Sequence, residues 1–216
     1  MRSTKEKLAD RPINSTRLIL CEGEDECDLL IMLRDEQGLS EAAVEIKTTK
    51  GRDNIENKWS LIKNQANASG ITYLAIVFDS EENPAASKQW AEQFVIKHQT
   101  VSLKVACFQL PAIDQSGSIE SLIRSGIAPT SVGFDCATQW EACVQSKPDT
   151  AFKLKAKLDK AWLQVWLTHR TTSTASRIGY AIKNDGSPNK TLRNEIDGAL
   201  EPLRNILNAV LAEQNV

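Results

Sequence analysis

Short apolar runs alternate with amphipathic segments along the first half of the chain. Four segments have the pattern of strands: 18–21, 42–48, 73–78 and 101–110. Between them, apolar residues spaced three or four apart predict three helices, at about residues 25–37, 53–68 and 83–98. Because strands and helices alternate, the pattern predicts an α/β fold with a mostly parallel sheet covered by helices on both faces.

Beyond residue 117 the pattern is helical. Leu158, Trp162 and Trp166 predict a helix whose apolar side covers the sheet, and residues 190–213 predict a last helix with one apolar face. That face favours packing within the chain, and dimerisation is the alternative. We therefore predict three parts: a flexible N-terminal arm (1–15), an α/β domain (16–125) and a helical C-terminal extension packed on it (126–216).

Two of the predicted strands end in acidic residues. The first stops at a turn that contains Glu22 and Glu26, and the third stops at Asp79 and Glu81. Ligands bind at the carboxyl ends of the strands in open α/β sheets, so we expect the two acidic groups to meet there. Carboxylates gathered without cysteine or histidine suit a hard cation such as Mg²⁺ or Mn²⁺.

These acidic motifs resemble those of the Toprim domain of topoisomerases, primases and OLD-type nucleases. The matching segments are Glu22-Gly23-x-x-Glu26, Asp79-x-Glu81 and Gly117-Ser118-Ile119-Glu120. The third is similar to the Gly-x-Leu-Glu segment of small stand-alone proteins of the OLD-related type. The resemblance covers residues 15–125 and implies a Toprim-like, Rossmann-type, mostly parallel sheet of about four strands, with a Mg²⁺-dependent phosphoryl-transfer site.

The same resemblance implies roles for individual residues. The implied metal ligands are Glu22, Glu26, Asp79, Glu81 and Glu120. The implied catalytic residues are Glu22, Asp79 and Lys160, the lysine standing near the scissile phosphate. The chain departs from the family at Glu81, because the family has Asp-x-Asp where this chain has Asp79-Ser80-Glu81.

Basic residues are concentrated in the second half of the chain. Residues 146–195 contain ten lysines and arginines against four acids, whereas the whole chain has a net charge of −2. Any nucleic-acid binding must therefore come from a local patch, which this segment could supply. The alternative is the solvated face of a helix, formed by Lys153, Lys155 and Lys157.

A second basic group follows the predicted strand at 42–48. It consists of Lys47, Lys50 and Arg52. On the carboxyl edge of the sheet these side chains could hold a substrate phosphate, and the alternative is an ordinary solvated turn.

The remaining features place the chain among cytoplasmic proteins. Its five cysteines are an odd number without a C-x-x-C pair, which favours free thiols. No apolar run approaches the roughly 20 residues that span a membrane. The phosphate-binding motif G-x-x-x-x-G-K-[ST] does not occur, so an OLD-type mode of action would require a separately encoded ATPase.

The leading hypothesis is a Mg²⁺- or Mn²⁺-dependent nuclease that cleaves phosphodiester bonds in DNA or RNA. Its expected partners are nucleic acid, a separately encoded ATPase and a second copy of the chain. The main alternative is a catalytically degenerate Toprim-like module that binds a partner protein or nucleic acid. A primase fragment and a receiver-like fold with one phosphorylated aspartate are further alternatives.

Overall fold

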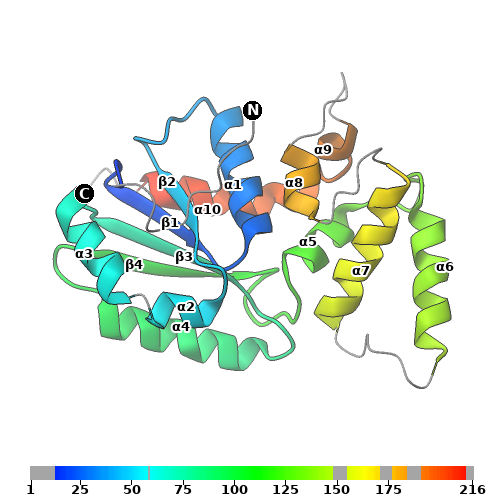
Figure 1. The fold of residues 1–216 in the computed structure, drawn as a ribbon, viewed down its shortest axis with the longest axis horizontal. Coiled ribbons are helices and arrows are strands. Elements are labelled where there is room, and N and C mark those ends of the chain that lie inside the picture. The colour runs from blue at the N-terminus through cyan, green and yellow to red at the C-terminus, as the bar shows by residue number, and fades with distance from the viewer. Residues whose placement is uncertain (1–12, 58, 148–154, 171–176, 184–190, 213–216) are drawn as a thin grey trace.

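The computed structural model describes residues 13–57, 59–147, 155–170, 177–183 and 191–212 (Figure 1). Residues 1–12 of the predicted N-terminal arm lie outside this part, as do Lys153 and Lys190 of the basic segment. Ile13, the first described residue, is buried in the core beside the sheet. No described helix is long and apolar enough to cross a membrane.

A four-stranded parallel sheet forms the centre of the molecule. Its strands are β1 (Arg17–Cys21), β2 (Glu45–Thr48), β3 (Tyr73–Asp79) and β4 (Lys104–Leu110). They lie in the order β2-β1-β3-β4, and every neighbouring pair is parallel. The sheet and its flanking helices confirm the predicted α/β fold.

Helices follow the strands and cover the sheet from both sides (Figure 1). The helices of the first half are α1 (Glu24–Glu36), α2 (Arg52–Asn57), α3 (Trp59–Ser69) and α4 (Pro84–His98). The later helices are α5 (Ile119–Gly126), α6 (Phe134–Gln145), α7 (Lys155–Thr168), α8 (Ile178–Lys183), α9 (Thr191–Glu195), the 3₁₀ helix η1 (Asp197–Leu200) and α10 (Glu201–Ala212). The helical character predicted beyond residue 117 is therefore confirmed for the described residues.

Alternate residues of β1, β3 and β4 belong to two separate cores. Leu18 and Leu20 of β1 face a core that includes Ile55, Ile62 and Phe94 of α2, α3 and α4. Their neighbours on β1 face a larger core, built with side chains of α1, α5, α7, α8 and α10. This alternation is the period of two that a pleated strand imposes.

Three predicted boundaries are wrong in detail. The strand predicted at 42–48 begins at Glu45, because residues 41–43 form a turn in which the Ala43 N–H donates to the Ser40 carbonyl. The helix predicted at 53–68 is two helices, α2 and α3, which adjoin at position 58 outside the described residues. The strand predicted from residue 101 begins at Lys104, because residues 100–103 form a turn. In that turn Thr100 Oγ1 accepts a hydrogen bond from the Leu103 N–H, and Thr100 N–H donates to the Leu103 carbonyl.

The single last helix predicted at 190–213 is also wrong, because three helical pieces, α9, η1 and α10, occupy this segment. Pro202 has no N–H to donate, and its ring would clash with the carbonyl four residues earlier in a continuous helix. Its place in the first turn of α10 avoids both problems. The apolar side of α10 is buried, and this helix packs against α1, so the predicted packing role is confirmed.

The helix around Trp162 does not cover the sheet as predicted. α7 packs against α5 and α6, beside the sheet in Figure 1. Trp162 meets the ring of Phe134 edge to face at 5.2 Å, and the guanidinium of Arg124 lies 4.7 Å from its ring. Trp166 donates a hydrogen bond to Ser131 Oγ at 3.0 Å. The buried tryptophans of α7 thus join helices to one another.

Candidate functional site

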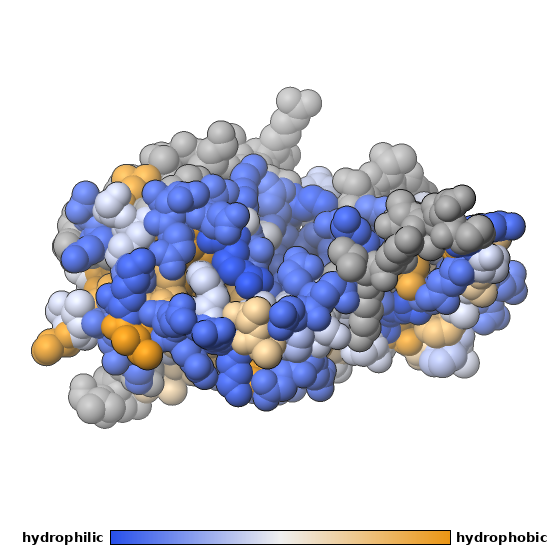
Figure 2. Space-filling view, turned by 90° about the horizontal axis from the view of Figure 1, so that it is seen from below, coloured by the Kyte–Doolittle hydropathy of each residue, from blue (hydrophilic) through white to orange (hydrophobic). Residues whose placement is uncertain are grey.

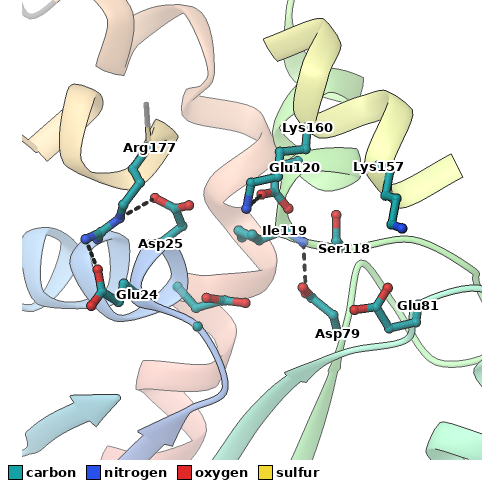
Figure 3. Close-up of a pocket in the computed structure, with 12 residues that line it drawn as sticks. Glu24, Asp25, Asp79, Glu81, Ser118, Ile119, Glu120, Lys157, Lys160 and Arg177 are labelled. Carbon is teal, nitrogen blue, oxygen red and sulfur yellow. Dashed lines mark hydrogen bonds and ion pairs between the residues drawn. The ribbon is translucent and has the colours of Figure 1, made fainter. Parts of the chain in front are cut away.

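A cavity of about 400 Å³ lies at the carboxyl edge of the sheet (Figure 3). Segments far apart in the sequence meet around it: the start of α1, the turn after β3 and the start of α5, with α7 and α8 alongside. Its acidic lining residues are Glu24, Asp25, Glu26, Asp79, Glu81 and Glu120. Its basic lining residues are Lys157, Lys160 and Arg177. We call Asp25, Glu26, Asp79, Glu81 and Glu120 the carboxylate cluster.

Glu26 is the most buried member of the carboxylate cluster, with 2% of its surface exposed. It stands in the first turn of α1 and folds back toward Gly23, the residue that precedes this helix. A Cβ atom at Gly23 would lie 2.4 Å from Glu26 Oε2. The missing side chain at Gly23 therefore makes room for the buried carboxylate.

Asp79 connects the end of β3 to α5. Its Oδ1 accepts a hydrogen bond of 2.9 Å from the backbone N–H of Ile119, the first residue of α5. The free N–H groups at a helix N-terminus favour a carboxylate in this position. The bond places Asp79 beside Glu120, the next residue of the helix.

The turn after β3 is fastened to the segment before α5 by a second contact. Glu81 and Gly117 exchange two backbone hydrogen bonds, each of 2.8 Å. Glu81 adopts a φ of 55°, a left-handed conformation that is uncommon for a residue with a side chain. The two backbone bonds hold this conformation and bring Glu81 to the rim of the cavity (Figure 3).

Asp25 joins α1 to α8. Its Oδ1 accepts a hydrogen bond of 2.8 Å from the backbone N–H of Gly179. A Cβ atom at Gly179 would lie 2.5 Å from the Asp25 carbonyl oxygen and 2.9 Å from its Cα. Only glycine allows the two helices to approach so closely without movement of the backbone.

Burial and mutual repulsion raise the pKa values within the carboxylate cluster. Burial, and then the nearby Glu120, raise the pKa of Glu26 to about 8. Burial raises the pKa of Asp25 to about 6, although the Gly179 N–H opposes the shift. Burial and the carboxylates of Glu26 and Glu120 also raise the pKa of Asp79 well above its usual range. Such a cluster favours the binding of protons or of a cation.

Basic side chains contact the acids of the site. Lys160 Nζ lies 3.2 Å from Glu120 Oε1, so that a cation already stands at the cluster. Burial would lower the pKa of Lys160, but attraction to Glu120 outweighs it and raises that pKa. On the opposite side, Arg177 forms ion pairs with Glu24 and Asp25 (Figure 3). It also pairs with Asp28 of α1.

Arg52 of α2 joins the two strand ends that carry acids. Its Nε lies 3.5 Å from Glu22 Oε2, and its guanidinium donates hydrogen bonds to the Asp79 carbonyl and to Ser87 Oγ. The guanidinium also lies 5.0 Å from the ring centroid of Phe78. Arg52 thereby fixes the spacing between the ends of β1 and β3.

The chemistry of the donor groups fits a hard divalent cation. The cluster offers only carboxylate oxygens, which are the donors that Mg²⁺ and Mn²⁺ prefer. Burial raises the pKa of Glu26, and the neighbouring carboxylates raise it further, so a bound cation would stabilise its charged form. Among the described residues, no three His, Cys, Asp or Glu side chains already stand together as metal ligands.

A family model described as "Protein of unknown function (DUF3226)" matches residues 16–211, which is most of the chain. The chain belongs to this family. Neither a curated protein nor a solved structure matches it. The match extends from β1 to α10, so the family comprises the sheet together with the later helices that complete the cavity.

Most of the site residues predicted for this family member line one cavity. They are Glu26, Asp79, Glu81, Glu120 and Lys160. Glu22 stands beside the cavity, where its Oε2 accepts a hydrogen bond of 3.4 Å from the Asp79 N–H and faces Arg52. The structure thus brings the predicted residues together. Glu22 contacts Asp79 and Arg52 at the edge of the site.

The basic residues predicted as a phosphate site, Lys47, Lys50 and Arg52, do not form one group in the structure. Lys47 is buried, with its Nζ 3.0 Å from Glu45 Oε1, because both side chains belong to the covered strand β2. Lys50 pairs with Glu24 at 3.0 Å. Lys50 and Arg52 therefore pair with acids that follow β1, whereas Lys47 pairs with an acid of its own strand.

Four charged residues of the cavity were not predicted to belong to it: Glu24, Asp25, Lys157 and Arg177. Asp25 lies in the acidic turn, but only its bond to α8 distinguishes it from its neighbours. Lys157 had the pattern of a solvated helix face. Nothing local to Arg177 indicates that it would reach α1, which is about 150 residues earlier in the chain.

Proposed function

We propose that this protein is a Toprim-like nuclease that uses Mg²⁺ or Mn²⁺ to hydrolyse phosphodiester bonds in DNA or RNA. The observation that carries the proposal is the carboxylate cluster itself. Five carboxylates from three separate segments line one cavity, and burial and mutual repulsion raise the pKa values of four of them. Buried carboxylates that repel one another lower the stability of a fold, and a bound cation would offset that cost.

Glu26, Asp79 and Glu120 are the residues best placed to hold the cation, with Glu81 at the rim. When bound, the cation would supply positive charge that stabilises the oxygens of a phosphodiester group during hydrolysis. The Ile119 N–H already orients Asp79, and Glu120 follows Ile119 on α5. The helix α5 therefore sets the distance between two of the proposed ligands.

Lys157 and Lys160 are suited to bind the phosphate backbone. Both stand on α7 and line the cavity next to the carboxylate cluster (Figure 3). A positive group beside an acidic metal site attracts a polyanion that the carboxylates alone would repel. Lys160 would exchange its contact with Glu120 for one with phosphate once a cation neutralises the glutamate.

A second candidate function is a binding module without catalytic activity. The internal ion pairs favour it, because Lys160, Arg52 and Arg177 already neutralise acids of the site. In that case the cluster would be a structural feature, and the cations around it would bind a partner protein or nucleic acid. For either function we propose a cytoplasmic location, since all five cysteines are free.

The deciding experiment is a cleavage assay on single- and double-stranded DNA and RNA, with Mg²⁺, Mn²⁺ or EDTA. Asp79→Asn keeps an oxygen that can accept the Ile119 N–H and removes the charge, so it should abolish metal-dependent cleavage without unfolding the protein. Glu92→Gln, on the exposed side of α4, is the matched control and should cleave like the wild type.

Calorimetric titration of Mg²⁺ and Mn²⁺ into the same variants separates the two candidate functions. Saturable binding that Asp79→Asn abolishes, together with cleavage, supports the nuclease. Cleavage that survives in Asp79→Asn would overturn the assignment of this residue. A wild type that binds nucleic acid, but does not bind metal and does not cleave, would support the binding module instead.

A further inference from the structure

We propose that a second cavity, at the amino edge of the sheet, binds a nucleoside phosphate, either free or as the end of a nucleic-acid strand. The cavity has a volume of about 430 Å³. It lies between α3, α4 and the turns that precede β3 and β4, at the opposite end of the strands from the carboxylate cluster (Figure 1). We call it the amino-edge cavity. It shares no described lining residue with the first cavity, so its occupant is independent of the proposed nuclease activity.

The charges around the amino-edge cavity are positive. Lys63 of α3 and Lys97 of α4 line it, and none of the described residues that line it is acidic. The first cavity, by contrast, has six acids in its lining. Thr72, Thr100 and Ser102 add hydroxyl groups that can bond to oxygens of a ligand. In a chain with a net charge of −2, this local composition favours an anion.

Lys63 has no acidic partner in the described part of the chain. It is exposed and forms no ion pair with another described residue. Lys97 is different, because its Nζ lies 3.3 Å from Glu56 Oε2 and it stands in the last turn of α4, where a positive charge complements the helix dipole. Neither role applies to Lys63, which stands near the middle of α3. An anion in the cavity would give Lys63 a charged partner.

His98 lines the same cavity and lacks a hydrogen-bond partner. Its side chain is 7% exposed, and its Nε2 forms no hydrogen bond with a described residue, since Glu56 Oε2 is 3.9 Å away. Burial lowers the pKa of His98, and Lys97 and Lys63 lower it further, although Glu56 opposes the shift. Both lysine charges therefore act at the imidazole. An anion bound between these groups would be attracted by the lysines, and its oxygens would supply the hydrogen bond that Nε2 lacks.

Trp59 adds an aromatic wall to the amino-edge cavity. Its ring centroid lies 4.1 Å from that of His98 and 5.1 Å from that of Phe94, and these contacts hold the indole in place. Trp59 is only half-buried, so part of its ring is open to a ligand. The buried residues Ile71 and Leu103 also line the cavity. A flat ring that packs on the indole, joined to a group that the lysines bind, fits this lining, and a nucleoside phosphate has both parts.

The size of the cavity and the surface around it favour a small ligand. Cavities that hold small molecules have volumes of about 300–1,000 Å³. On the face of the molecule where α4 lies, the surface is mainly hydrophilic, and its apolar residues form small separate patches (Figure 2). Large continuous apolar patches mark interfaces with other proteins. This face therefore favours a small ligand over a protein partner.

The first test is calorimetric titration of AMP into the full chain in EDTA. One AMP should bind per chain with a Kd below about 1 mM, whereas adenosine and inorganic phosphate should each bind at least about tenfold more weakly. Lys63→Met should weaken AMP binding roughly tenfold, because it removes a charge-assisted contact. Lys88→Met, at an exposed lysine in the first half of α4, is the matched control and should bind like the wild type. No saturable binding of AMP, phosphate binding as tight as that of AMP, or unchanged binding in Lys63→Met would overturn the proposal.

Two further measurements locate the bound AMP and identify its source. The indole N–H resonance of Trp59, assigned with Trp59→Phe, should shift during the titration, and Lys160→Met in the first cavity should leave AMP binding unchanged. An unmoved Trp59 resonance, or loss of AMP binding in Lys160→Met, would place the ligand elsewhere and overturn the proposal. A trinucleotide with a terminal phosphate should compete with AMP if the cavity takes the end of a strand, and should not compete if it takes the free nucleotide.

Discussion

Asp79 Oδ1 accepts a hydrogen bond of 2.9 Å from the backbone N–H of Ile119. This bond fixes the end of β3 against the start of α5, and so determines how close Asp79 stands to Glu120, which follows Ile119. The helix N-terminus attracts the Asp79 carboxylate, while the neighbouring carboxylates repel it. Backbone contacts therefore hold Asp79 among carboxylates that repel it.

Stability should depend on pH through Glu26 and Asp25. Their folded-state pKa values, about 8 and about 6, exceed the ordinary values of 4.5 and 3.8. The folded protein thus keeps protons that the unfolded chain releases as pH rises, so the free energy of unfolding should fall between about pH 4 and pH 8. Urea unfolding in EDTA, repeated across this range, measures the slope.

Glu26→Gln should remove much of that pH dependence and raise the stability at pH 8 by a few kcal/mol, since it deletes a buried charge. Glu92→Gln should leave the slope unchanged, because Glu92 is exposed. A wild-type stability that does not fall toward pH 8 would contradict the raised pKa of Glu26. Addition of Mg²⁺ at pH 8 should restore stability in the wild type if the cluster binds the ion.

Gly179→Ala should destabilise the protein by about 1–3 kcal/mol. Its Cβ atom would collide with the backbone of Asp25, which cannot rotate away as a side chain could. Gly198→Ala is the matched control, because a Cβ atom there meets nothing within 4 Å. Thermal unfolding of the two variants compares them directly, and similar melting temperatures would show that α8 does not pack on α1 as described.

Arg52→Lys should lower the stability by roughly 1–2 kcal/mol although the charge is kept, because lysine lacks the planar fork that reaches Glu22, Ser87 and the Asp79 carbonyl. We also expect weaker Mg²⁺ binding, since the ends of β1 and β3 would no longer be held together. Arg204→Lys, on an exposed pair of acids, should change neither property. Denaturation and calorimetry measure the two effects separately.

Lys160→Met should separate metal binding from cleavage. The ion pair with Glu120 is half-exposed on the lysine side, so its loss should cost less than about 1 kcal/mol of stability. Without the competing cation, Glu120 should bind Mg²⁺ more tightly, whereas cleavage should fall because a phosphate contact is lost. Unchanged cleavage in this variant would exclude Lys160 from the reaction.

The sequence predicted the parts of this molecule that local pattern determines. The apolar runs that end at Glu22 and Asp79 indicate buried strands with acidic ends, and a parallel sheet necessarily brings those ends to one edge. Glu120 was assigned to the same site because its segment resembles a Toprim motif. These predictions depend on the periodicity of apolar residues and on short motifs, both of which can be recognised in the sequence alone.

Other features depend on contacts that a pattern does not encode. Lys47 was expected at the carboxyl edge of the sheet, but it is buried on the covered strand β2, where it pairs with Glu45. The spacing of Trp162 and Trp166 predicts an apolar helix face but not the element that covers it. In the structure α7 packs against α5 and α6. The Arg177 contact with α1 could be found only from the fold, because the residues are far apart in the chain.

The bond between Asp25 and Gly179 spans 154 residues of sequence. During synthesis, the acidic turn after β1 leaves the ribosome long before α8 can reach it. Until then Asp25 faces water, in which a carboxylate ionises with its ordinary pKa. The contact between α1 and α8 can therefore form only late in synthesis, after Gly179 has emerged, so the wall of the cavity that α8 supplies is among the last parts to be completed.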